Sequence, residues 1–279
     1  MSAASDRWER IASARSDDVS LAEGALLIAA EEYEGLDVDR YLERIDEMGA
    51  VLRRRLRSDI STAEALIALN RYVFEELGFS GNTDDYYDPR NSYLNDVIER
   101  RVGIPITLAV VYIEIGRRIG LSLQGVSFPT HFLVKCVLRE GAIILDPYAR
   151  GASLGVDDLQ ERLRSVSEGL ELDPTLVASL LTPAAPADIF ARMLRNLRAI
   201  HLERGEHLKA LCASNRILGL QPDAADEYRE RGELYDKLEC VRAALADFRH
   251  YLKLNPQARD SDRVARRMAD LEPLAARLN

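Results

Sequence analysis

Two residues in the middle of the chain, His131 and Asp146, are of the types that activate a nucleophile. His131 begins one run of apolar and β-branched residues, and Asp146 ends the next run. If the two runs form a hairpin that turns near residues 138–140, the two side chains lie on the same face of a sheet. A histidine oriented by a carboxylate is the base half of a nucleophilic triad. The third member is expected on the first turn of a buried helix, whose dipole favours a thiolate.

The elements that would position these residues follow from the apolar pattern. Short runs rich in Val, Ile, Leu and Phe, separated by turn residues, predict strands at 123–128, 131–138 and 142–145. Before and after them, apolar residues recur at helical spacing. One such helix begins at Pro105 and is closed by Gly120, a typical helix-ending residue. This part of the chain is therefore expected to be α+β, mostly helical with a small antiparallel sheet.

The last third of the sequence has the period of tetratricopeptide repeats, which are helical hairpins. Pro222 and Pro256 are 34 positions apart (256 − 222), which is that period. The signature positions of the second repeat hold Tyr228, Gly232, Tyr235, Ala244 and Phe248. We predict repeats at 191–224 and 225–258, followed by a capping helix that begins at Ser261.

Two prolines in the segment Thr182-Pro-Ala-Ala-Pro186 mark the domain boundary, because they interrupt any helix that crosses it. We expect a first domain at 1–181, with residues 1–18 disordered, and an all-α repeat module at 187–279. Such repeats either offer a concave surface to a peptide or protein, or serve intramolecular packing alone. Both interpretations stay open.

Ordered motifs in the first domain resemble a known family. The pattern of the transglutaminase-like superfamily is matched at Gly103-Ile-Pro-Ile-Thr-Leu-Ala109, Arg117-Arg-Ile-Gly120, His131 and Leu145-Asp-Pro147. More closely, the chain resembles the transglutaminase-like branch of the bacterial SirB family, at residues 69–79, 91–97, 103–105, 128–134 and 146–148. The resemblance covers roughly residues 20–260. It implies a papain-like core with C-terminal tetratricopeptide repeats, a Cys–His–Asp triad and a regulatory role.

On this pattern, Pro105 occupies the position of the nucleophilic cysteine. Proline suits the first turn of a helix, where its missing N–H is not needed, so the helix start is kept and the nucleophile is absent. Cys136 lies an odd number of residues from His131 on the same predicted strand and therefore points to the opposite face. Cys212 and Cys240 belong to the repeat helices. None of the three cysteines replaces the missing thiol.

Other interpretations of the same residues stay open. Thr107 is the only hydroxyl near the start of that helix, so a Thr107–His131–Asp146 arrangement, or an activated water, is the catalytic alternative. The His131–Asp146 pair also fits a polar contact that fixes the hairpin, or part of a binding pocket. In the last case, the residues expected to line the cleft are Asn91, Asn95, Pro105 and Tyr148.

Composition restricts the environment and the partners. The 279 residues carry a formal net charge of −9, which repels phosphate backbones, so no nucleic-acid partner is expected. Unpaired cysteines and the lack of a signal-peptide core favour the cytoplasm. The longest apolar segment, 103–113, ends at Glu114 before it could cross a bilayer, so no membrane association is expected. The histidines show no metal-ligand spacing, and no glycine loop would hold phosphate, so we expect no metal and no cofactor.

The leading hypothesis from the sequence is a non-catalytic, transglutaminase-like protein that acts as a cytoplasmic protein-binding or regulatory factor. Its partner would be a protein or peptide held by the repeats or by the remnant cleft. The rival is a hydrolase or acyl-transfer enzyme that uses His131 and Asp146 with Thr107 or water. A third alternative is a purely structural repeat protein. The sequence gives no indication of the oligomeric state.

Overall fold

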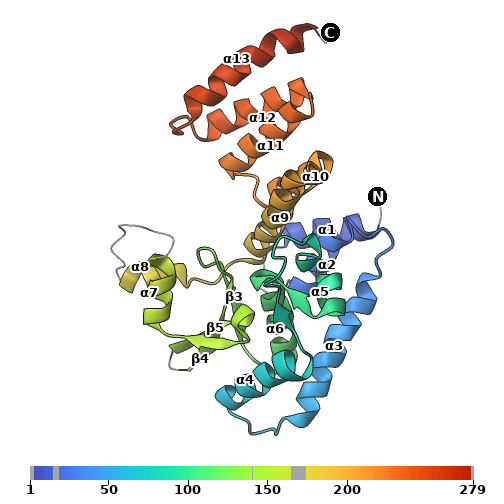
Figure 1. The fold of residues 1–279 in the computed structure, drawn as a ribbon, viewed down its shortest axis with the longest axis vertical. Helices are drawn as coiled ribbons and strands as arrows, with labels where there is room; N and C mark the ends of the chain where they lie inside the picture. Colours follow the sequence, from blue (N-terminus) through green and yellow to red (C-terminus); the bar gives the residue numbers. More distant parts are fainter. Residues whose placement is uncertain (1–2, 15–18, 140, 165–173, 278–279) are drawn as a thin grey trace. The chain divides into compact units, whose positions relative to one another are not determined.

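The structure, a computed structural model, describes residues 3–14, 19–139, 141–164 and 174–277. The chain divides into two compact units, Met1–Ile189 and Phe190–Asn279. The first contains helices and a small antiparallel sheet, and the second is entirely helical in its described part (Figure 1). The predicted fold class is therefore confirmed.

The first unit is built around one central helix, α6 (Pro105–Arg118). Every residue of this helix from Pro105 to Gly116 is buried, as expected for a helix that is apolar on all sides. Four other helices and four strands pack against it. The remaining helices of this unit are α1 (Ala3–Ser13), α2 (Leu21–Ala29), α3 (Val38–Arg55), α4 (Thr62–Asn70), α5 (Leu94–Arg100), α7 (Val156–Arg164) and α8 (Pro174–Leu180), with a π-helical turn η1 (Arg71–Glu76) and 3-10 turns η2 (Pro89–Asn91) and η3 (Pro147–Ala149).

The N-terminal segment differs from the sequence prediction of disorder over residues 1–18. Residues 3–13 form α1, and two of its side chains, Trp8 and Ile11, are buried. Arg7 Nε donates a hydrogen bond to Glu23 Oε1 of α2 at 2.8 Å. The prediction was wrong here because apolar residues three apart, together with one ion pair, attach a short helix that local propensity alone would not stabilise. Residues 15–18 lie outside the described part.

The main sheet is antiparallel with the strand order β3-β4-β5-β6. The strands are β3 (Leu123–Val126), β4 (Leu133–Leu138), β5 (Gly141–Asp146) and β6 (Ala152–Leu154), and a separate parallel pair consists of β1 (Ser80–Gly81) and β2 (Val102–Gly103). In the hairpin of β4 and β5, Val134 pairs with Leu145. Helices α7 and α8 pack on the sheet through a buried cluster of Val126, Phe128, Leu133, Ile144, Leu159, Leu163 and Val177.

The second unit contains helical hairpins of the predicted kind. The helices are α9 (Pro186–Glu203, which begins in the first unit), α10 (His207–Leu220), α11 (Ala225–Lys237), α12 (Val241–Leu254) and α13 (Ser261–Arg277). Ala244 and Phe248 are buried in the core of the α11–α12 hairpin. Pro222 and Pro256 each follow the end of a helix. Within the described ranges, no helix combines the length and the apolar character needed to span a membrane.

Gly232 allows α11 and α12 to approach closely. A Cβ atom at this position would lie 2.7 Å from the ring of Phe248. We expect Gly232→Ala to lower the free energy of unfolding by about 1–3 kcal/mol, because the Phe248 ring must move away from its packed position. Chemical denaturation measures the change, and Gly219→Ala, where a Cβ would meet nothing within 4 Å, is the control. Equal stability of the two variants would contradict the close-approach role.

Candidate functional site

Asp146 is the centre of the candidate site and has only 1% of its surface exposed. It ends β5 and caps η3, since its Oδ1 accepts hydrogen bonds from the backbone N–H groups of Tyr148 (3.0 Å) and Ala149 (3.2 Å). Its Oδ2 faces Arg162 Nη1 at 2.8 Å and His131 Nε2 at 3.6 Å. The buried carboxylate is thus held by backbone donors on one oxygen and by a cation on the other, as a buried charge requires.

His131 lies in the turn between β3 and β4 rather than on the predicted strand. The strand begins later because Pro129 and Thr130 (φ 59°) form the turn, and the backbone N–H of His131 donates to the Phe128 carbonyl at 3.1 Å. Its side chain is 30% exposed. The structure brings the imidazole to Asp146 as the hairpin argument predicts, but at 3.6 Å, which is longer than a hydrogen bond.

Arg162 is a site residue that the sequence pattern did not indicate. It lies on α7 between Leu159 and Leu163, which are both buried against the sheet. The apolar face of α7 therefore carries the guanidinium to Asp146, where it forms an ion pair at 2.8 Å. The available signal was one arginine at the margin of an apolar helical stripe, and nothing local identifies its partner.

Pro105 and Thr107 hold the start of α6. Pro105 occupies the first turn, as the sequence predicts. The hydroxyl of Thr107 donates to the carbonyl oxygen of Asn91 at 2.8 Å and accepts the N–H of Ile104 at 3.1 Å, and the residue is fully buried. Through these hydrogen bonds the Thr107 hydroxyl connects the start of α6 to η2. The geometry therefore favours the structural role for Thr107 over that of a nucleophile.

We expect Thr107→Val to lower the free energy of unfolding by about 1–3 kcal/mol, because the Asn91 carbonyl and the Ile104 N–H lose their shared partner. Thr107→Ser keeps the hydroxyl and serves as the control, with a smaller expected loss. Urea denaturation followed by circular dichroism measures both. A valine variant as stable as the wild type would remove the structural explanation.

The two predicted cleft asparagines have different surroundings. Asn91 is fully buried, and its Nδ2 donates to the carbonyl oxygens of Asp85 (2.7 Å) and Tyr86 (3.3 Å). It therefore supports the loop before η2 rather than lining an open space. Asn95 lies on α5, is 5% exposed, and its Oδ1 has no hydrogen-bond partner among the described residues.

Tyr148 connects this loop to the site. Its hydroxyl donates to the carbonyl oxygen of Asn82 at 2.9 Å, and its ring meets the His131 ring edge-on, with centroids 6.3 Å apart. Burial and the nearby charge of Asp146 raise the pKa of Tyr148 above its usual value, so the hydroxyl stays a proton donor. Gly81 provides room for the ring, since a Cβ there would lie 2.4 Å from it.

The cysteines do not supply a nucleophile to this site. Cys136 is buried on β4, and burial raises the pKa of its thiol, which disfavours the thiolate. Cys212 and Cys240 are exposed and lie in the second unit. Within the described ranges, no group of three or more His, Cys, Asp and Glu side chains is placed to hold a metal ion.

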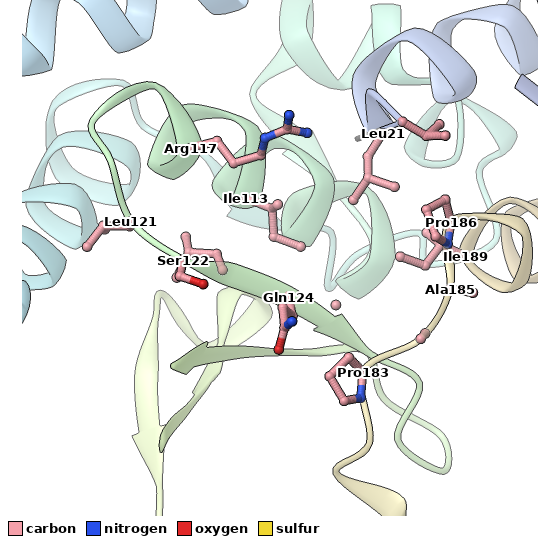
Figure 2. A pocket seen from close by; sticks show the side chains of 14 residues that line it. Leu21, Ile113, Arg117, Leu121, Ser122, Gln124, Pro183, Ala185, Pro186 and Ile189 are labelled. Carbon is pink, nitrogen blue, oxygen red and sulfur yellow. The ribbon is translucent and has the colours of Figure 1, made fainter. Parts of the chain in front are cut away.

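A cavity of about 530 Å³ lies in another part of the first unit, beside the outer edge of β3 (Figure 2). Its lining combines apolar side chains, among them Leu21, Ile113 and Ile189, with polar groups, and Arg117 is its charged member. Neither His131 nor Asp146 lines it. This space is therefore separate from the candidate site.

The segment between α8 and α9 runs along that outer edge of β3. The backbone N–H of Ala184 donates to the Gly125 carbonyl at 2.8 Å. The neighbouring Pro183 and the first residue of α9, Pro186, line the same cavity and have no N–H to donate. The segment therefore pairs with the strand at one point without extending the sheet.

Comparison with known proteins adds to this geometry. The family described as the transglutaminase-like superfamily matches residues 39–195, more than half of the chain. The chain belongs to this superfamily. A second family, the tetratricopeptide repeat, matches residues 197–269 of the chain. The sequence resemblance is confirmed at this level, and the narrower assignment to the SirB branch stays a prediction.

Relatives of this transglutaminase-like protein occur in bacteria and in animals. A UPF0162 protein of Xylella fastidiosa (strain Temecula1) is 39% identical over 264 residues, which cover 95% of this chain and 94% of the relative. A UPF0162 protein of Pseudomonas aeruginosa is 33% identical, over 92% of this chain and 93% of the relative. Human F-box only protein 21 is 37% identical over 106 residues, 35% of this chain and 17% of that protein.

Proposed function

We propose that this chain is a non-catalytic transglutaminase-like protein that binds other proteins through its repeats and its remnant cleft. The observation that carries the proposal is Pro105, which begins α6 at the position where the family pattern has the nucleophilic cysteine. A proline side chain has neither a thiol nor a hydroxyl to attack an acyl group. The nearest hydroxyl on that turn, Thr107, is buried and hydrogen-bonded to the backbone.

The ion pair of Asp146 with Arg162 supports the same proposal. In a nucleophilic triad the carboxylate orients the imidazole and stabilises the imidazolium that forms. Here Oδ2 lies closer to Arg162 (2.8 Å) than to His131 (3.6 Å). The guanidinium charge offsets the negative charge that would raise the basicity of His131. The pair is therefore better suited to fixing the turn and shaping a surface than to general-base catalysis.

The repeats supply the second part of the proposal. Tetratricopeptide repeats commonly present a surface to other proteins. In this chain, two ion pairs join α11 to α13, Arg263 to Glu233 and Arg267 to Asp236, and a third joins Arg229 of α11 to Asp260, the residue before α13. Salt bridges of this exposed kind contribute little stability one by one, but a series of them keeps neighbouring helices in one arrangement. A surface fixed in this way loses less entropy when a partner binds.

An acyl-transfer assay separates this proposal from the enzymatic alternative. The full chain is incubated with a glutamine-containing peptide plus a labelled primary amine, and separately with an aryl ester, and intact-mass spectrometry detects acylated protein. We expect no adduct, and equal background rates for the wild type and His131→Ala. An adduct on any residue of the wild type that is absent from a folded His131→Ala variant would establish catalysis and overturn the proposal.

Cross-linking tests the role of the repeats. The chain has only four lysines: Lys135 on β4 in the first unit, and Lys209, Lys237 and Lys253 in the second. The full chain is used to capture proteins from a bacterial extract, and an amine-specific reagent is then added. We expect cross-links to captured proteins from the three lysines of the second unit. Reproducible capture with cross-links from Lys135 alone would contradict a binding role for the repeats.

A further inference from the structure

Four aromatic side chains of the first unit form a continuous row that ends at His131. Tyr87 contacts Tyr86 edge-to-face, with ring centroids 5.4 Å apart. Tyr86 meets Tyr148 in the same manner at 6.5 Å, and Tyr148 meets the imidazole of His131 at 6.3 Å. We call these four residues the aromatic row. It joins the loop before η2 to the site of His131 and Asp146.

The outer end of the aromatic row is exposed but held in place. Tyr87 is 61% exposed and Tyr86 40%. The loop that carries them is fixed by two amide side chains: Asn82 Oδ1 accepts the N–H of Asp85 at 3.0 Å, and Asn91 Nδ2 donates to the Asp85 carbonyl at 2.7 Å. Neighbouring tyrosines exposed on a fixed loop are typical of a contact surface, because rigid aromatic rings bind with little loss of entropy.

The charge beside these rings is negative. Asp84 and Asp85 directly precede the two tyrosines, are exposed, and form no ion pair among the described residues. The nearby cation Arg90 is paired with Asp88 through three contacts of 2.8–3.0 Å. Aromatic faces attract cations, and free carboxylates next to them add to that preference. The surface is therefore complementary to a positively charged group.

We propose that the aromatic row, with Asp84 and Asp85, binds an arginine-bearing segment of a partner protein. A planar guanidinium stacks on a tyrosine ring and can donate to a carboxylate at the same time, which the compact ammonium of lysine does less well. The inference rests on the proposed function, because it names the partner chemistry of the remnant cleft. His131 closes the inner end of the surface and needs no catalytic role in it.

A peptide titration tests this inference on the full chain. The probe is a fluorescein-labelled peptide with two arginines among glycines and serines, and its control carries citrulline, which has the same shape without the charge. Fluorescence anisotropy measures both affinities. We expect saturable binding of the arginine peptide and at least about tenfold weaker binding of the citrulline peptide. Equal binding of the two peptides would overturn the inference. So would tighter binding of a third peptide in which glutamates replace the two arginines.

Substitutions locate the binding to the aromatic row. We expect Tyr87→Ala to lower the affinity for the arginine peptide by about threefold to fivefold, which is the range of an exposed cation–π contact. Asp85→Asn should lower the same affinity by about twofold to threefold. Ile67→Ala, at another exposed apolar side chain (69%), is the control and should leave affinity unchanged. Thermal unfolding confirms that each variant is folded.

The outcomes distinguish this inference from the proposed function. Unchanged affinity in both Tyr87→Ala and Asp85→Asn would show that the peptide binds elsewhere, and the inference would be wrong. Capture of partners through the repeats would still be expected in that case. An acyl adduct in the mass-spectrometric assay would instead overturn the non-catalytic proposal, whatever the peptide affinities.

Discussion

Replacement of Glu227 with alanine is expected to lower the free energy of unfolding by about 3–5 kcal/mol. Glu227 on α11 is 5% exposed, and its two carboxylate oxygens pair with Arg195 and Arg198 of α9. Arg198 is itself only 8% exposed. The alanine variant would leave this guanidinium buried without a counter-charge, which costs more than the pair contributes when intact.

Urea denaturation of the full chain measures the change, and two variants make the result specific. Glu233→Ala removes a carboxylate whose side chain is 39% exposed and pairs with Arg263, so we expect a loss of at most about 1 kcal/mol. The double variant Arg198→Leu with Glu227→Leu removes both charges, and should recover most of the stability. A loss below about 1 kcal/mol for Glu227→Ala would mean that water reaches Arg198.

Replacement of Asp146 with alanine is expected to cost about 3 kcal/mol of unfolding free energy. Two effects add. The backbone N–H groups of Tyr148 and Ala149 lose the acceptor that caps η3, and the guanidinium of Arg162 loses its counter-charge. Asp146→Asn keeps an acceptor oxygen for the cap and removes only the charge, so its loss should be about half as large.

The same denaturation measurement separates the two effects. Arg162→Met in the Asp146→Ala background removes the cation that faces Asp146 in the wild type and should recover part of the loss. Asp157→Ala on the exposed face of α7 is the control, with an expected change within about 0.5 kcal/mol. If Asp146→Ala were as stable as the control, the carboxylate would not be the structural centre of the site.

Much of the first unit follows from local pattern. Helix α6 is specified by Pro105 on its first turn, by the apolar run that follows, and by Gly120 just after its end. The structure places this helix at the centre of the core. The hairpin of β4 and β5 follows from two apolar runs around a turn. The 34-residue period likewise specifies the α11–α12 hairpin and the close approach at Gly232. These features depend on residues near one another in the sequence.

The missed features depend on contacts between distant segments. Arg162 meets Asp146 only because the buried face of α7 lies on the sheet. The Thr107 hydroxyl bonds to Asn91, 16 residues away, and this tertiary contact decides between its two interpretations. Helix α1 is too short to be stable alone and is fixed by contacts with α2. The sequence predicts His131 on a strand because period-two alternation does not show where a turn ends, and the turn extends through Thr130 (φ 59°).

The single bond between Ala184 and Gly125 has a consequence for solubility. β3 is a terminal strand of its sheet, and such strands offer unpaired backbone groups to which other chains can add, the first step of aggregation. The segment that leads into α9 covers this edge at one point. Its prolines have no backbone N–H, so they cannot donate the hydrogen bonds that would pair the segment with a further strand. The stretch that leads out of the first unit thereby also protects it from self-association.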